Sequence, residues 1–221
     1  MSRSDDAAQT ALLSRLLVVA NPGLDQQDLF RQAANLKREQ DCEVFVLAFS
    51  PIEACGAQPL GSVAKIQEQL QLLLLGFFTE ADNVRVSVVE VAAGGQAMAK
   101  NITAFCSENQ IDLLIKTSHP SGSVFHRSTD WELMRSLSCN LLLLSERHWK
   151  PKQSILAAID IENTDEIQQQ LNCQILNWTR VIAQSRGDDV HVLSCIELNR
   201  ALLELGMSET LAVEQKRGSS I

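Results

Sequence analysis

Side chains that could bind a metal, transfer a proton or act as a nucleophile are concentrated in one loop, residues 116–128. His119 and His126 are candidate metal ligands or general bases, because a neutral imidazole can serve as either. No cysteine or carboxylate cluster next to them supplies the further ligands that a metal site needs. None of the loop's three serines lies in a Gly-x-Ser-x-Gly turn: Ser118, Ser121 and Ser123. We therefore predict no catalytic residue and no metal site, and interpret these side chains as those of a polar loop.

The residues after this loop have the pattern of a helix start. Ser128 and Thr129 carry hydroxyl groups that can cap the first backbone N–H groups of a helix. Asp130 would lie in the first turn, where a negative charge is favoured. Trp131 is expected to pack over the end of a sheet or, as the alternative, to anchor the second unit.

The elements that must position this loop alternate regularly between strands and helices. Apolar runs predict strands at 15–20, 42–49, 84–91, 111–115 and 141–144. Helical spacing of apolar residues predicts helices at 25–40, 62–81, 96–108 and 129–137. The alternating pattern of the third strand is typical of a sheet edge. The fold class predicted is α/β, with a five-stranded parallel, doubly wound sheet.

The pattern restarts after residue 145, which indicates a partial second copy. The strand predicted at 154–159 resembles 14–20, and a helix at 165–184 and a strand at 190–196 follow it. The predicted division of the chain is a disordered segment, a complete unit, a linker and a partial unit: 1–13, 14–145, 146–152 and 153–221. The open side of strand 154–159 would then lack a partner strand, which favours self-association.

Composition and charge exclude several classes of partner. The net charge of −8 would repel a phosphate backbone, so nucleic-acid binding is not expected. The longest apolar run, Leu72–Phe78, is too short to cross a bilayer and is interpreted as core. The polar N-terminus does not have the features of a signal peptide, so we expect a cytoplasmic location. The six cysteines include no Cys-x-x-Cys pair and are interpreted as reduced thiols.

Two stretches resemble the universal stress protein family. Residues 95–116 (GQAMAKNITAFCSENQIDLLIK) are similar to its third helix and fourth strand. Residues 128–135 (STDWELMR) resemble the tandem, E-type members, which carry Thr-Asp-Trp at this point. The resemblance implies a sheet of strand order 3-2-1-4-5. It also implies a ligand site at the carboxyl ends of strands 1 and 4, where this order reverses.

The family's ATP-binding members have an aspartate after strand 1 and a Gly-x2-Gly-x9-Gly-Ser/Thr loop after strand 4. In this chain Asn21 stands at the aspartate position, and Gly122 and Pro120 stand in a loop with little glycine freedom. The second unit keeps an acid, Asp160, but has no phosphate loop. The positions equivalent to the family's nucleotide site are, in chain order, Asn21, Lys116, Thr117, His119, Gly122, Ser128, Thr129 and Asp160.

These departures imply a degenerate nucleotide site and no bound cofactor. Lys116 is expected either to contact an anion or to point into solvent. The predicted function is that of a non-catalytic stress-response protein, not an enzyme, which acts as a homo-oligomer or with a protein partner. The alternative is an ATP- or nucleotide-binding stress protein that uses the loop after strand 4.

Overall fold

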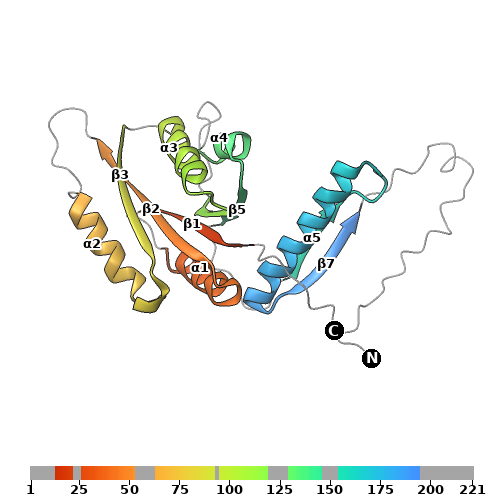
Figure 1. The fold of residues 1–221 in the computed structure, drawn as a ribbon, viewed down its shortest axis with the longest axis horizontal. Helices are drawn as coiled ribbons and strands as arrows, with labels where there is room; N and C mark the ends of the chain where they lie inside the picture. The colour runs from red at the N-terminus through yellow and green to blue at the C-terminus, as the bar shows by residue number, and fades with distance from the viewer. Residues whose placement is uncertain are drawn as a thin grey trace, which may run out of the picture.

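The computed structural model describes residues 13–21, 26–52, 63–92, 95–118, 129–145 and 154–194. The larger of its two sheets has the strand order β3-β2-β1-β4-β5, and all of its pairs are parallel (Figure 1). Its strands are β1 (Arg15–Ala20), β2 (Glu43–Ile52), β3 (Arg85–Ala92), β4 (Leu113–Thr117) and β5 (Asn140–Leu144). The predicted fold class and strand order are confirmed, and β3 lies at an edge as its alternation indicated.

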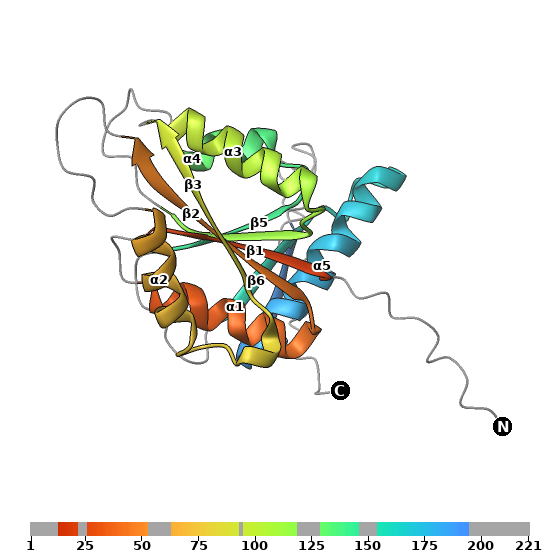
Figure 2. The ribbon, with the colours of Figure 1, turned by 60° about the vertical axis from the view of Figure 1, so that its left-hand side comes forward.

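Helices cover both faces of this sheet (Figure 2). One face carries α1 (Gln27–Gln40) and α2 (Val63–Leu74), and the other carries α3 (Gly95–Glu108) and α4 (Thr129–Ser136). This arrangement follows from right-handed crossovers that run in opposite directions from β1.

The second helix ends earlier than the sequence predicts. After Leu74 the backbone tightens, and Gly76 N donates to the carbonyl of Leu73. A short 3₁₀ helix, η1 (Glu80–Asp82), follows. Asp82 accepts hydrogen bonds from the backbone N and hydroxyl of Thr79, and the backbone bond is the main reason that the pKa of this carboxyl is lowered. The helix thus ends in a tighter turn, and a new capped element begins at Thr79, although the apolar pattern continues.

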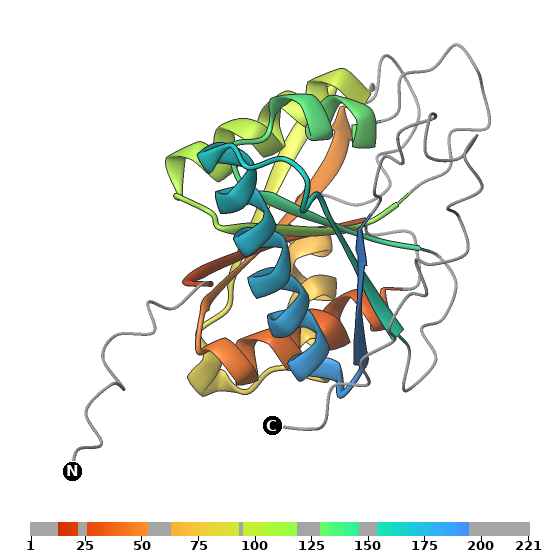
Figure 3. The same cartoon turned by 90° about the vertical axis from the view of Figure 1, so that its right-hand side faces the viewer.

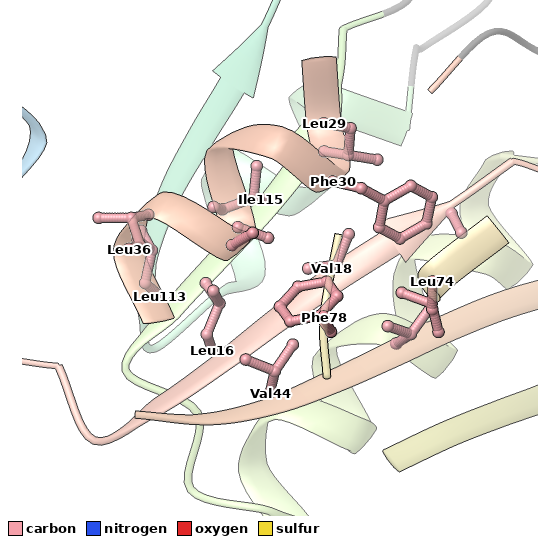
Figure 4. Packing of buried hydrophobic residues seen from close by; sticks show 14 of the residues in the cluster. Leu16, Val18, Leu29, Phe30, Leu36, Val44, Leu74, Phe78, Leu113 and Ile115 are labelled. Carbon is pink, nitrogen blue, oxygen red and sulfur yellow. The ribbon is translucent and has the colours of Figure 1, made fainter. Parts of the chain in front are cut away.

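The core has two halves, one on each side of the sheet. Leu16 and Val18 of β1 face α1 and α2, where they pack with Phe30 (Figure 4). Leu17 and Val19 face the other way and belong to the cluster that contains residues of α3 and α4. Because both faces of a central parallel strand are buried, its sequence is a continuous apolar run.

The start of β1 is held by Asp112, the residue just before β4. Its carboxylate accepts hydrogen bonds from the backbone N–H groups of Ser14 and Arg15, at 2.8 and 2.9 Å. Leu13 next to them is fully buried in the core, so its assignment to a disordered segment is wrong; the rest of that segment lies outside the described residues.

The smaller sheet pairs β6 (Ser154–Ile159) with β7 (Asp189–Ser194) in parallel, with α5 (Glu166–Arg186) between them in sequence. α5 lies against α1 of the first unit (Figure 3). Val181 of α5 is buried in the α1 side of the core. The buried side chain of Gln32 on α1 donates to Ser185 at 3.2 Å and accepts from Arg186 at 3.4 Å. Residues 13–145 and 154–194 thus share apolar core and a satisfied buried amide.

Several sequence predictions concern segments outside the described residues: the linker at 146–152, the loop at 119–128 and the helical pattern around Leu202–Leu211. Among the helices that the structure describes, none combines the length and the apolar character that crossing a membrane requires.

Candidate functional site

The strand order reverses between β1 and β4, and this point defines the candidate site. Val19 near the end of β1 is paired with Lys116 near the end of β4. From β1 the chain passes to β2 on one side, whereas β4 lies on the other side and leads to β5. In open α/β sheets the crevice at the carboxyl ends of such neighbouring strands is where ligands bind.

A buried ion pair stands at this position. The Lys116 ammonium group donates to Oδ1 of Asp130 at 2.5 Å and to the backbone carbonyl of Thr117 at 2.7 Å. The hydroxyl of Ser118 donates to the other oxygen of Asp130 at 3.1 Å. Lys116 and Asp130 are only 4% and 6% exposed, so the pair is almost removed from water. We refer to Lys116, Thr117, Ser118 and Asp130 as the switch-point cluster.

Local structure explains why these two charges meet. Lys116 and Leu114 are two residues apart in β4, so their side chains point to the same face of the sheet. The side chain of Leu114 lies in the α3 and α4 half of the core. Leu133 of α4 is fully buried in the same half. Asp130 precedes Leu133 by three residues, so it lies on the same face of α4, one turn closer to the helix start. Burial of Leu133 therefore brings Asp130 to Lys116.

Two predictions at this site need correction, those for Lys116 and Trp131. Lys116 neither points into solvent nor lies open to an external anion, because it is buried against Asp130. Asp130 lies in the first turn of α4, as predicted, and is in addition the partner of that lysine. Trp131 does not lie buried over the sheet end: its side chain is 58% exposed, because residues next to a buried helical position point away from the core.

The remaining candidates of the first unit are only partly brought together. Asn21 follows β1 and is exposed, and its carbonyl accepts a hydrogen bond from the side chain of Gln26. Thr117 contributes its carbonyl to Lys116, and Thr129 begins α4. His119, Gly122 and Ser128 lie outside the described residues.

Asp160, the acid predicted for the second unit, forms a turn. Its Oδ1 accepts hydrogen bonds from the backbone N–H groups of Glu162 and Asn163, at 3.1 and 3.2 Å. Its backbone N–H donates to the side chain of Asn172 on α5. This pattern is that of an aspartate that shapes the loop between a strand and a helix.

The electrostatics of the switch-point cluster disfavour phosphate binding. Two of the three N–H groups of Lys116 are used within the cluster, and its charge is balanced by Asp130 at contact distance. A phosphate placed there would also meet the negative charge of Asp130. Within the described part of the chain, no group of three or more His, Cys, Asp or Glu residues is arranged to hold a metal ion.

The sequence analysis did not predict the Lys116–Asp130 ion pair, although the sequence contains a signal for it. A lysine inside a buried strand needs a counter-charge, because an unpaired buried ammonium group is too costly. No acidic residue lies between Lys116 and Asp130 in the sequence, so Asp130 is the first acid that the chain offers after the strand.

An open parallel α/β sheet with its site at the reversal of strand order defines the class of protein. The sequence profile of the universal stress protein family matches residues 13–145, and the chain belongs to this family. The predicted resemblance to the family is thereby confirmed, and the tandem, E-type arrangement stays a prediction.

Two solved structures and one curated protein are similar to this chain. A putative universal stress protein from Pseudomonas aeruginosa UCBPP-PA14 superimposes with a TM-score of 0.65 and 19% identity, over 88% of this chain and 66% of that one. A functionally unknown protein from Pseudomonas aeruginosa PAO1 superimposes with a TM-score of 0.65 and 19% identity, over 89% of this chain and 65% of that one. Universal stress protein E of Photorhabdus laumondii is 25% identical over 88 residues, which are 38% of this chain and 28% of that protein. The chain thus covers less than two thirds of each.

Proposed function

We propose that this chain is a non-catalytic stress-response protein with a degenerate nucleotide site, which acts by association with itself or with protein partners. The observation that carries the proposal is the buried Lys116–Asp130 pair at the reversal of strand order. Where a nucleotide site needs free N–H donors and net positive charge, this chain has a neutralised lysine and a carboxylate. The acid of the second unit is likewise used in a turn.

Calorimetric titration with Mg²⁺ and ATP tests the nucleotide half of this proposal. We expect no saturable heat up to about 1 mM ATP, a concentration at which a site worth about 4 kcal/mol would be half occupied. Binding with a micromolar Kd that is lost in Asn21→Ala or Gly122→Val would contradict the proposal. That result would establish the alternative, a nucleotide-binding stress protein that uses the loop after β4.

The smaller sheet supports the association half. In the part of the chain that the structure describes, β7 is the only ladder partner of β6. Ala157 is buried on the face that α5 covers, so Leu156 on β6 and Leu193 on β7 share the opposite face. These two leucines are 60% and 45% exposed. An open strand edge beside exposed leucines is a surface that association would cover.

Sedimentation velocity over a range of protein concentrations tests this surface. We expect a monomer–oligomer equilibrium that shifts toward monomer in Leu156→Lys, because a charge on the open face would have to be buried. Leu72→Lys is the matched control, since Leu72 on α2 is exposed to a similar extent, 64%. A wild-type protein that is monomeric at every concentration and that captures no protein partner would contradict the proposal.

A further inference from the structure

Two cysteines, Cys106 and Cys139, pack in the same half of the core. Cys106 is in the last turns of α3 and is 2% exposed, and Cys139 is the residue before β5 and is partly buried. Both belong to the half of the core that also holds Leu133 of α4. Each thiol is the main cause of the shift in the other thiol's pKa. The fold thus brings together two cysteines that are far apart in the sequence.

The backbone around the pair is held by hydrogen bonds that connect three elements. Ile111 N donates to the carbonyl of Cys106 at 3.0 Å, which closes the end of α3. The carbonyl of the next residue, Asp112, accepts both the backbone N–H and the side-chain amide of Asn140, at 3.0 and 3.1 Å. Cys139 directly precedes Asn140, so the positions of both thiols are fixed by ordered backbone.

The two thiols differ in accessibility and in proton affinity. Interaction with the Cys139 thiol, and then burial, raises the pKa of Cys106, whereas interaction with the Cys106 thiol lowers the pKa of Cys139. The backbone N–H of Cys139 lowers it further, while burial and the nearby charge of Asp112 oppose the change. Cys139 is therefore the thiol that ionises first and that solvent reaches more easily, which makes it the better nucleophile.

We propose that Cys106 and Cys139 are a reversible redox pair that closes to an intramolecular disulfide on reaction with a peroxide. The Cys139 thiolate attacks one peroxide oxygen, the O–O bond breaks, and the departing hydroxide takes up a proton to form water. The sulfur of Cys106 then attacks the sulfenic acid on Cys139. An S–S bond forms, the S–O bond breaks, and the second oxygen leaves as water with the Cys106 proton. Two thiols are oxidised and one peroxide is reduced to two waters.

The segment that the disulfide would close contains the whole switch-point cluster. β4, the loop after it and α4 all lie between Cys106 and Cys139 in the sequence, and so do Lys116 and Asp130. Oxidation therefore closes a covalent ring around the switch-point cluster and restricts the local opening of β4 and α4. The inference does not depend on the proposed function, since it concerns thiol chemistry and not the ligand or partner.

Peptide mapping of the full chain tests the proposal. The reduced protein is treated with hydrogen peroxide, the remaining thiols are blocked with N-ethylmaleimide, and the digest is analysed by mass spectrometry without reduction. We expect a linked peptide that joins Cys106 to Cys139 as the first product, lost again on treatment with dithiothreitol. Cys42 should be labelled slowly throughout, because burial raises its pKa to about 11.

Two variants sharpen the test. Cys106→Ser should abolish the linked peptide and leave Cys139 as a sulfenic acid that dimedone traps. Cys173→Ser is the matched control, since Cys173 is exposed on α5 and should leave the linked peptide unchanged. The wild-type map decides the question even if Cys106→Ser does not fold. Recovery of Cys106 and Cys139 as unlinked thiols while Cys173 is oxidised would overturn the proposal.

Discussion

Replacing Asp130 by Ala should lower the free energy of unfolding by about 3–5 kcal/mol, the cost expected when one partner of a buried ion pair is removed. The substitution leaves the Lys116 ammonium group buried, with the backbone carbonyl of Thr117 as its acceptor. It also removes the acceptor of the Ser118 hydroxyl. Urea denaturation followed by circular dichroism measures the loss as a lower midpoint at unchanged slope.

A double replacement separates the effect of the two charges from the effect of the side-chain volume. Lys116→Met with Asp130→Leu removes both charges and keeps similar volume, so its stability should return to within about 1–2 kcal/mol of wild type, or exceed it. Arg31→Ala is the control for an exposed pair, because Arg31 contacts Asp28 on the surface of α1 and its side chain is 57% exposed. Its loss should cost about 0.2–1 kcal/mol.

An Asp130→Ala variant that is as stable as Arg31→Ala would contradict the claim that Lys116 and Asp130 form a buried ion pair. In that case Lys116 would be solvated in solution and available to an external anion, which is the alternative that the sequence had left open. The same denaturation series at high salt adds an independent check. The effect of Asp130→Ala should change little with salt, because buried charges are screened much less than exposed ones.

The fold could be predicted from the sequence because its signals are repeated and mutually consistent. The run RLLVVA predicts the bounds of β1 as the structure has them, Arg15–Ala20, since a strand buried on both faces has no polar interruption. The bounds of β6, Ser154–Ile159, were also predicted, because its apolar run resembles that of β1, although Ala157 alone is buried in this strand. The end of α2 could not be predicted from apolar spacing, because backbone tightening at Gly76 and the Thr79 cap act locally and leave the apolar pattern intact.

The site was harder to predict because its character depends on pairings across the sequence. Lys116 alone is compatible with an anion site, a solvated side chain or an ion pair, and the packing of Leu133 selects the last of these. Cys106 and Cys139 were interpreted as separate reduced thiols because no short spacing connects them. Only the meeting of the end of α3 with the start of β5 makes them a pair.

Val181→Asp should detach α5 and the smaller sheet from the first unit while residues 13–145 stay folded. Val181 is 3% exposed and packs in the α1 side of the core, so the substitution buries a carboxylate without a partner. The substitution should lower the free energy of unfolding by about 3–5 kcal/mol. A two-stranded sheet with one covering helix is only marginally stable alone, so residues 154–194 should lose their order when the contact is broken.

Hydrogen exchange measured by mass spectrometry distinguishes the detachment of α5 and the smaller sheet from unfolding of the whole chain. In Val181→Asp the amides of α5, β6 and β7 should exchange fast, while those of β1 and β4 keep their protection. Ile167→Asp is the matched control on the same helix, since Ile167 is 83% exposed and should tolerate the charge.

Loss of protection in both units together would show that they fold as one cooperative unit, against the division predicted at residues 146–152. The contact with α1 gives a physical reason to expect separate behaviour. Gln32 is buried only because Ser185 and Arg186 of α5 satisfy its amide, and water can replace both once α5 leaves. Residues 13–145 therefore lose some apolar burial, but the loss of α5 leaves no newly unsatisfied polar group at Gln32. Their own core, built around β1, remains sufficient to hold them folded.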